Sequence, residues 1–235
     1  MRLGIMQPYF LPYLGYFSLI KHTDKFIIFD TPQFIRHGWI ERNRISNPNG
    51  GWQYISVPLK KHAQTASIDS IRINNEVNWK QKIIAQMVHY KKAPYYNAVA
   101  GLIKRALDEE YQDIVTLDVN LLQTVCDYLK IDAHIEIFSQ MDLTIQEAKE
   151  PDEWALNICR AIKDVDEYWN PPGGQSFFDV SKYEQAGIDI KFQKINLRRY
   201  RQGKNEFQEG LSIIDVMMHS SSEKINEMLD DFELL

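Results

Sequence analysis

A basic and aromatic cluster occupies residues 30–45, which read DTPQFIRHGWIERNRI. Arg36, Arg42 and Arg44 lie within nine residues of one another, with Trp39 and Asn43 between them. Guanidinium groups bind phosphates and carboxylates through paired hydrogen bonds, and an indole offers a flat face to a base or sugar ring. The pattern predicts a site for an anionic ligand. The alternative is a solvated basic loop that Trp39 anchors to the body of the protein.

A second group of candidate ligand-binding residues lies between residues 7 and 16, in the stretch QPYFLPYLGY. Tyr9, Tyr13 and Tyr16 supply hydroxyl donors and aromatic faces, and Gly15 allows a phosphate to approach the backbone. The alternative is that Gly15 permits close helix packing and that the tyrosines are half-buried core residues.

Two weaker patterns occur later in the chain. In YWNPPGGQSFFD, Gly173, Gly174 and Gln175 follow an apolar segment, where a glycine pair places backbone N–H groups near a sheet edge or merely makes a turn. In EGLSIIDVMM, Ser212 and Asp215 have the spacing of a helix cap. If that helix begins beside a ligand pocket, the same two side chains can instead contact phosphate, sugar or metal.

The elements that must position these residues form an α/β pattern. Residues 2–7 and 25–30 read as buried strands around a helix at 14–22, which makes a compact βαβ unit with parallel strands. Asp30 ends the second strand, at the edge of the sheet where ligands bind in doubly wound folds.

Beyond this unit, residues 31–51 read as a long loop or a partly helical insertion. Three helical segments follow between about 76 and 130, and further strands are expected at 133–138, 166–169 and 188–195. We therefore predict a single α/β domain over residues 1–235: a mainly parallel sheet flanked by helices, with a mostly helical insert at about 76–130.

Composition excludes several classes of protein. A net charge of −5 and a pI of about 5.7 argue against a nucleic-acid binder. No apolar run approaches the roughly 20 residues that cross a membrane, and the N-terminus lacks a signal-peptide pattern, so the cytoplasm is expected. Cys126 and Cys159 lie in apolar stretches typical of core positions. The six histidines show no metal-ligand spacing, so no metal site is predicted.

The segment PYLGYFSLI, residues 12–20, resembles the HxGH turn of class I nucleotidyl transferases and pantothenate synthetases. Gly15 matches that pattern, whereas Tyr13 and Tyr16 stand in place of the histidines. A tyrosine donates a hydrogen bond to phosphate but does not become a cation near neutral pH. The resemblance therefore implies a Rossmann-like fold of the HUP type and nucleotide-like binding more than adenylyl transfer.

Four stretches together resemble the WbqC-like protein family: MQPYFLPYLGYFSLI, FDTPQFIRHGWIERNRI, YWNPPGGQSFFD with GIDIKFQKIN after it, and GLSIIDVMM. The resemblance covers nearly the whole chain and implies a role in bacterial surface-polysaccharide biosynthesis, for O-antigen or capsule. It adds Gln7 and Gln33 to the candidate site and includes Asp30, which the end of the second strand already indicates. Gln7 and Asp30 would position an acyl group or an amine, and Arg42 would stabilise charge beside them as the third candidate catalytic residue.

Two functions fit this pattern. The first is a transferase or an AMP-forming ligase that joins an acyl or aminoacyl group to a nucleotide-linked amino sugar, with ATP or the nucleotide sugar as the bound nucleotide. The second is a non-catalytic protein of the same pathway that binds a nucleotide sugar or acts as a scaffold.

Overall fold

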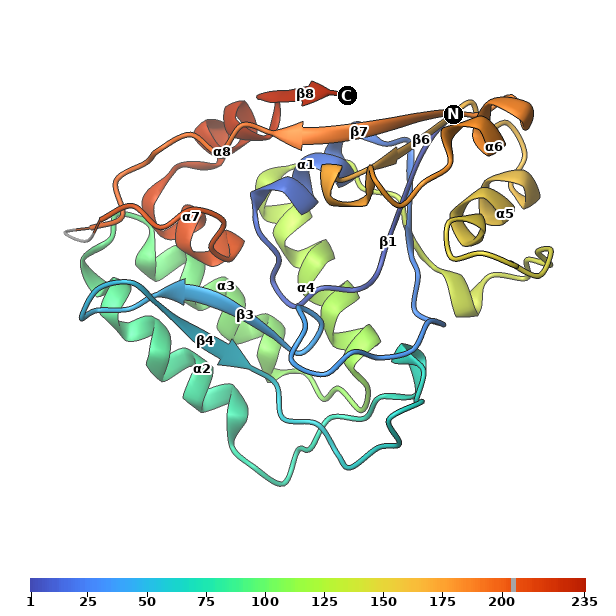
Figure 1. Cartoon of the computed structure of the whole chain (residues 1–235). Helices are drawn as coiled ribbons and strands as arrows, with labels where there is room; N and C mark the ends of the chain where they lie inside the picture. Colours follow the sequence, from blue (N-terminus) through green and yellow to red (C-terminus); the bar gives the residue numbers. More distant parts are fainter. Residues whose placement is uncertain (204–205) are drawn as a thin grey trace.

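A computed structural model describes residues 1–203 and 206–235. In this part of the chain six strands form one sheet, in the order β5-β2-β1-β6-β7-β8, and two strands form a separate hairpin (Figure 1). The strands of the sheet are β1 (Arg2–Met6), β2 (Lys25–Ile28), β5 (Ile135–Ile137), β6 (Glu167–Asn170), β7 (Asp189–Ile195) and β8 (Phe232–Leu234). The hairpin consists of β3 (Arg42–Ser46) and β4 (Trp52–Ser56).

The sheet is mainly parallel, as the sequence predicted. Strands β1 and β2 pair in parallel with Ile5 opposite Ile27, and β1 also pairs in parallel with β6. Strands β5 and β7 extend this parallel arrangement on either side, and only β8 runs antiparallel to its neighbour β7. The carboxyl ends of five strands therefore meet at one edge, which is where the loops that bind ligands in Rossmann-like folds lie.

Helices cover both faces of the sheet. They are α1 (Leu14–His22), α2 (Trp79–Met87), α3 (Tyr96–Asp108), α4 (Ile114–Leu129), α5 (Glu153–Ala161), α6 (Val180–Gln185), α7 (Ile213–His219) and α8 (Ser222–Leu229). Short 3₁₀ turns are η1 (Ile68–Ser70), η2 (Val88–Lys92), η3 (Phe138–Gln140) and η4 (Pro172–Gly174).

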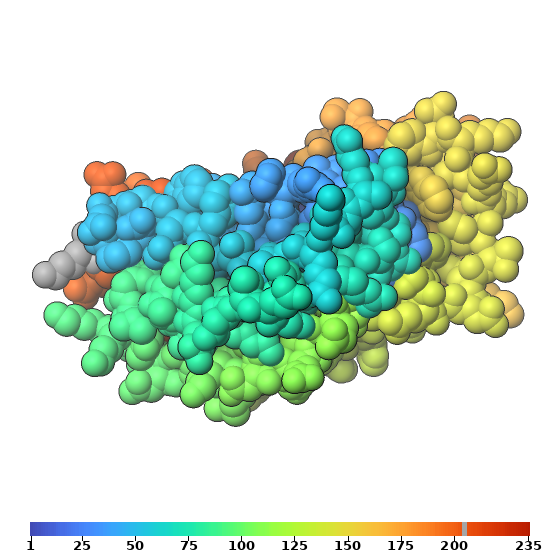
Figure 2. Space-filling view, turned by 90° about the horizontal axis from the view of Figure 1, so that it is seen from below, coloured from blue at the N-terminus to red at the C-terminus, as the bar shows by residue number. Residues whose placement is uncertain are grey.

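Two hydrophobic cores lie on opposite faces of the sheet because side chains alternate along each strand. Phe26 and Ile28 of β2 belong to the larger core with α1, α4 and α8, whereas Ile27 belongs to the smaller core with α5 and α6. The larger core continues beneath the hairpin and helices α2 and α3, which form much of the lower face of the molecule (Figure 2). The single-domain organisation stays a prediction.

The expectation of a loop or a partly helical insertion at residues 31–51 was wrong at residues 42–46. Residues Arg42–Ser46 form β3, which pairs antiparallel with β4 so that Arg44 lies opposite Tyr54. On this strand Asn43 and Ile45 are buried while Arg42 and Arg44 are partly exposed. The strand therefore carries its two arginines on its outer face, at a spacing fixed by the pleat.

Candidate functional site

The loop between β1 and α1 is held in place by the hairpin. The Asn43 side-chain amide donates hydrogen bonds to the carbonyl oxygens of Phe10 and Leu11, at 3.0 and 3.1 Å. The backbone N–H of Phe10 donates to the carbonyl of Trp39 at 2.9 Å. Leu11 has a positive φ of 44°, which is unusual for a residue with a side chain. The contacts from β3 thus stabilise a strained loop, and Asn43 acts on the site by positioning it.

Tyr13 covers the start of α1. It stands at the N-cap position, and its ring lies so close to Gly15 that a Cβ on Gly15 would sit 2.5 Å from the Tyr13 hydroxyl oxygen. Glycine is therefore required here for the close approach of the aromatic ring. In the structure the Tyr13 ring occupies the place over Gly15 where a phosphate was expected.

Tyr16 points into the protein, away from the site. It is 1% exposed, and its hydroxyl donates a hydrogen bond to the Gln7 carbonyl at 2.8 Å. Its ring packs edge-on against Phe26 and Phe17. The core-residue alternative stated for the tyrosines therefore describes Tyr16, whose hydroxyl is engaged in fixing the end of β1.

Five residues singled out in the sequence line one pocket of about 230 Å³ beside this loop: Tyr9, Tyr13, Trp39, Asn43 and Arg44. Pro12, the first residue of the stretch 12–20 noted in the sequence, also lines it, and two further lining residues, Leu197 and Gly210, were missed. A signal existed for Leu197, because it follows β7 at the same edge of the sheet as the β1–α1 loop. Gly210 has a φ of +65° and lies before α7, and nothing in its local sequence indicates the pocket.

Arg44 is the charged group of this pocket. Its guanidinium lies 5.2 Å from the ring centre of Trp39 and 5.3 Å from that of Trp52, so two indoles hold it by cation–π contact. One Nη donates a long hydrogen bond to the Gly210 carbonyl at 3.4 Å. Its Nε is buried and has no hydrogen-bond partner among the described residues. A buried donor without a partner favours the binding of an acceptor group.

The two tyrosines of the pocket keep their phenolic protons at neutral pH. Burial raises the pKa of Tyr9 above its ordinary value, and burial followed by the nearby Tyr9 raises the pKa of Tyr13. Both hydroxyls can therefore donate a hydrogen bond to a ligand oxygen. The pocket combines aromatic faces, two hydroxyl donors and one guanidinium, a set suited to a sugar or base carrying a phosphate.

Arg36 and Arg42 line a neighbouring pocket of about 430 Å³ rather than the one that contains Arg44. Arg36 donates to the His62 carbonyl at 3.2 Å. Arg42 donates to the His37 carbonyl and stacks 4.1 Å from the ring centre of Tyr54. The three arginines of the sequence motif are thus divided between two pockets on the outer face of the hairpin.

The other candidates from the first two strand ends lie outside both pockets. Asp30 is 1% exposed, and its two oxygens accept hydrogen bonds from the N–H and hydroxyl of Ser139, at 3.0 and 2.5 Å. Gln33 is exposed and donates to the Gln64 carbonyl at 2.9 Å. Gln7 is partly buried directly after β1, at the carboxyl edge of the sheet.

The glycine pair near β6 makes a tight turn. Gly173 and Gly174 lie in the 3₁₀ turn η4, and Gln175 caps it. A Cβ on Gly174 would lie 2.8 Å from the ring of Phe178, so close packing explains that glycine. These residues do not line the pocket that contains Arg44.

Ser212 and Asp215 connect α7 to the rest of the fold. Ser212 is the N-cap: its hydroxyl accepts from the N–H of Ile214 and donates to the Leu11 carbonyl at 2.7 Å. Asp215 is fully buried and accepts hydrogen bonds from the hydroxyls of Tyr90 and Tyr200, at 2.5 and 2.7 Å. The capping alternative therefore describes Ser212, and both oxygens of Asp215 already have partners.

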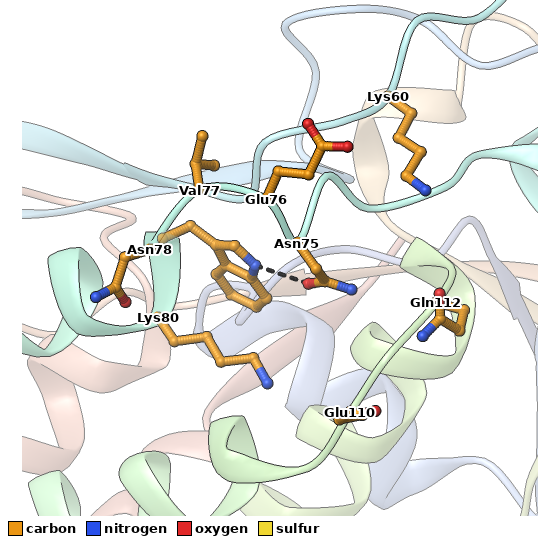
Figure 3. A pocket seen from close by; sticks show the side chains of 9 residues that line it. Lys60, Asn75, Glu76, Val77, Asn78, Lys80, Glu110 and Gln112 are labelled. Carbon is orange, nitrogen blue, oxygen red and sulfur yellow. Dashed lines mark hydrogen bonds between the residues drawn. The ribbon is translucent and has the colours of Figure 1, made fainter.

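A larger hollow of about 600 Å³ lies at the start of α2 and is lined by polar residues that include Lys60, Asn75 and Lys80 (Figure 3). Three of its lining side chains form hydrogen bonds. Trp79 donates to the Asn75 side chain at 3.1 Å, and Lys80 donates to the Glu109 carbonyl at 2.5 Å. Because Trp79, Asn75 and Lys80 are engaged in these bonds and the hollow involves no strand end, it is a weaker candidate.

Two negative findings concern residues 1–203 and 206–235. No three His, Cys, Asp or Glu side chains in these ranges gather closely enough to hold a metal ion. No helix in them has both the length and the apolar character needed to cross a membrane.

Comparisons with known proteins give the family. A protein of Mycobacterium tuberculosis (strain ATCC 25618 / H37Rv), named as the uncharacterized protein Rv1507c, is 27% identical over 225 residues, which cover 94% of this chain and 95% of the relative. No solved structure gives a significant match. The model of the WbqC-like protein family matches residues 7–227, which include the β1–α1 loop, the hairpin and α7. The chain therefore belongs to the WbqC-like protein family.

Proposed function

We propose that this protein binds a nucleotide-linked sugar, or another phosphate-bearing sugar, in the synthesis of bacterial surface polysaccharide. The WbqC-like family is associated with polysaccharide-related genes. The observation that carries the proposal is Arg44 at the carboxyl edge of a Rossmann-like sheet: its guanidinium contacts two indoles, and its buried Nε has no hydrogen-bond partner in the part of the chain that the structure describes.

The physical basis is the complementarity of the pocket to such a ligand. Phosphate oxygens accept charge-assisted hydrogen bonds from a guanidinium, and the binding is stronger where water is excluded. Trp39 and Tyr9 present ring faces on which a base or sugar ring packs. The Tyr13 hydroxyl, at the N-terminus of α1, donates to a sugar or phosphate oxygen in the same pocket.

We further propose that the bound sugar carries an amine that is acylated or aminoacylated. The enzyme would then act as a transferase or an AMP-forming ligase, by holding the amine and the acyl group together and stabilising charge. Gln7, at the end of β1, and Arg42, in the neighbouring pocket, are the residues that we assign to positioning and charge stabilisation. Asp30 supports this edge of the sheet through its contacts with Ser139.

A non-catalytic binding role is the second candidate, and one observation favours it. Tyr16, at the second HxGH-like position, is buried and bonded to the backbone. Among the described residues that line the Arg44 pocket, none has a carboxylate or an imidazole to move a proton. A binding protein needs neither group.

A thermal-shift series separates these functions. The full chain is heated with ATP, UDP-glucosamine and a dTDP-linked amino sugar, each with and without Mg²⁺. The proposed function predicts that at least one nucleotide sugar raises the melting temperature. ATP turnover with amide formation, measured in the presence of a carboxylic acid, supports the ligase. Stabilisation by a nucleotide sugar, with no turnover of either ATP or a thioester donor, supports the binding role. The absence of any shift contradicts both.

A further inference from the structure

The neighbouring pocket, which contains Arg42, has a charge pattern of its own. It holds about 430 Å³ between the loop before β3 and the two strands of the hairpin. Its charged walls carry both signs, because Glu41 lines it together with Arg36 and Arg42. A phosphate would meet the carboxylate, and a simple amine would meet the guanidinium groups. A ligand that carries both charges satisfies both.

The Glu41 carboxylate and the Arg42 guanidinium are held by the same residue. The backbone N–H of His37 donates to Glu41 Oε1 at 2.5 Å, and the carbonyl of His37 accepts from Arg42 Nη2. His37 has a positive φ of 62°, a conformation that is costly for a residue with a side chain. Such strain persists where surrounding contacts over-determine it, and it is frequent at binding sites.

Each of the two charged groups has one atom without a partner. Glu41 is 8% exposed, and its Oε2 accepts no hydrogen bond from any described residue. Arg42 Nε is likewise buried and donates to none of them, while the guanidinium stacks on Tyr54. Buried polar atoms are nearly always satisfied in folded proteins. Glu41 supplies an acceptor without a partner, and Arg42 supplies a donor without a partner, beside the same pocket. This pair indicates a ligand that carries a hydrogen-bond donor at one end and an acceptor at the other.

Behind Glu41 lies a second buried acid. Burial raises the pKa of Asp118 well above its usual value, and the nearby Glu41 and Asp113 add to the effect. The raised pKa favours the neutral form of Asp118, and Glu41 is the carboxyl group that lines the pocket. The remaining walls include Phe34, Val57 and Leu59, which are apolar.

We propose that this pocket binds a free α-amino acid with an apolar side chain. The ammonium group contacts Glu41, the carboxylate contacts Arg42, and the side chain packs against Phe34, Val57 and Leu59. The inference rests on the proposed function and deepens it, because it identifies the acyl component as an amino acid. The binding itself is independent of the Arg44 pocket.

Isothermal titration of the full chain with L-leucine and two analogues tests the proposal. The analogue 4-methylpentanoate lacks the amine, and 3-methylbutylamine lacks the carboxylate. L-Leucine is expected to bind saturably and each analogue at least about tenfold more weakly, since each loses one charge-assisted contact. L-Valine and L-isoleucine are titrated alongside. If none of the three amino acids binds, or if the analogues bind as well as leucine, the proposal is wrong.

Two variants locate the contacts. Glu41→Gln should weaken leucine binding about tenfold or more and leave 4-methylpentanoate unchanged, whereas Arg42→Lys should weaken leucine and leave 3-methylbutylamine unchanged. Glu184→Gln, at an exposed position on α6, is the matched control and should leave all affinities unchanged. Circular dichroism checks that each variant is folded. If one variant does not fold, the other variant and the titration of the wild type with the two analogues still test the proposal.

Unchanged leucine affinity in a folded Glu41→Gln variant would overturn the proposal. The partner of Glu41 Oε2 would then be the Asp118 carboxyl behind it, and not a ligand. A nucleotide-sugar titration of the same samples keeps the two proposals apart. Sugar binding without amino-acid binding refutes only this inference, and amino-acid binding without sugar binding refutes only the proposed function.

Discussion

Replacing Asp118 by asparagine should change how the stability of the protein depends on pH. Asp118 lies on α4, is fully buried, and has no hydrogen-bond partner for either oxygen among the described residues. Burial is the main cause that raises its pKa, and the carboxylates of Glu41 and Asp113 contribute. The folded protein therefore keeps a proton on Asp118 at pH values where the unfolded chain has released it.

The sign of the effect follows from proton linkage. Below the unfolded pKa of about 3.9, both states hold the proton and Asp118 is neutral in each. Above that pH only the folded state holds it, so this group lowers the free energy of unfolding by about 1.4 kcal/mol for each pH unit. The decline stops once the pH exceeds the folded pKa. Asparagine has nearly the same shape and does not titrate.

Urea unfolding of the wild type and of Asp118→Asn, measured from pH 4 to pH 8, tests this reasoning. The variant should gain stability relative to the wild type as the pH rises, with a difference that grows by about 1.4 kcal/mol per unit before it levels off. Asp127→Asn, exposed on the same helix, is the matched control. Parallel curves for wild type and Asp118→Asn would refute the claim that Asp118 is protonated in the folded state.

Three further substitutions test the architecture of the Arg44 pocket. Gly15→Ala should displace the Tyr13 ring, whose hydroxyl would be 2.5 Å from the new Cβ, and should weaken sugar binding in a titration while the helix gains up to about 1 kcal/mol in propensity. Asn43→Ala should lower the free energy of unfolding by about 1–3 kcal/mol in urea, because two loop carbonyls lose their donor. Tyr16→Phe should cost about 1 kcal/mol through the lost bond to Gln7 and leave sugar affinity unchanged, and a large loss of affinity would return Tyr16 to the site.

The βαβ unit at the N-terminus could be predicted from sequence because its signals are local. β1 and β2 are short apolar runs, and α1 lies between them after a loop rich in proline. These features specify buried parallel strands and place the following loop at the carboxyl edge of the sheet. Tyr9 and Tyr13 of that loop were named as candidates, and they line one pocket together with Arg44, which was named from the arginine cluster.

Strand β3 could not be predicted because its residues, RNRIS, have little intrinsic strand preference. Its conformation comes from pairing with β4 and from the burial of Asn43 and Ile45. Knowing that strand beforehand would have placed Arg42 and Arg44 on one face and Asn43 on the other. The loop interpretation treated all three as equivalent.

Long-range packing determines which of the remaining candidate residues line the pocket and which are buried. Tyr13 and Tyr16 are three positions apart in one motif, yet one lines the pocket and the other is buried because α1 is covered along nearly its whole length. Leu197 and Gly210 join the pocket from a segment close to the other end of the chain from the first strand. Ser212 was correctly given a capping alternative, since a serine before an apolar helix has a local role whatever the surroundings.

Calorimetric titration of UDP-glucosamine into the wild type, Arg44→Ala and Arg160→Ala tests whether Arg44 binds the phosphate of a nucleotide sugar. Arg160 is an exposed arginine on α5, on the opposite face of the sheet, and serves as the control. We expect saturable binding to the wild type and the control, and a loss of roughly 1.5–3 kcal/mol, or about 10- to 150-fold, in a folded Arg44→Ala variant. Equal affinity in all three proteins would contradict this expectation.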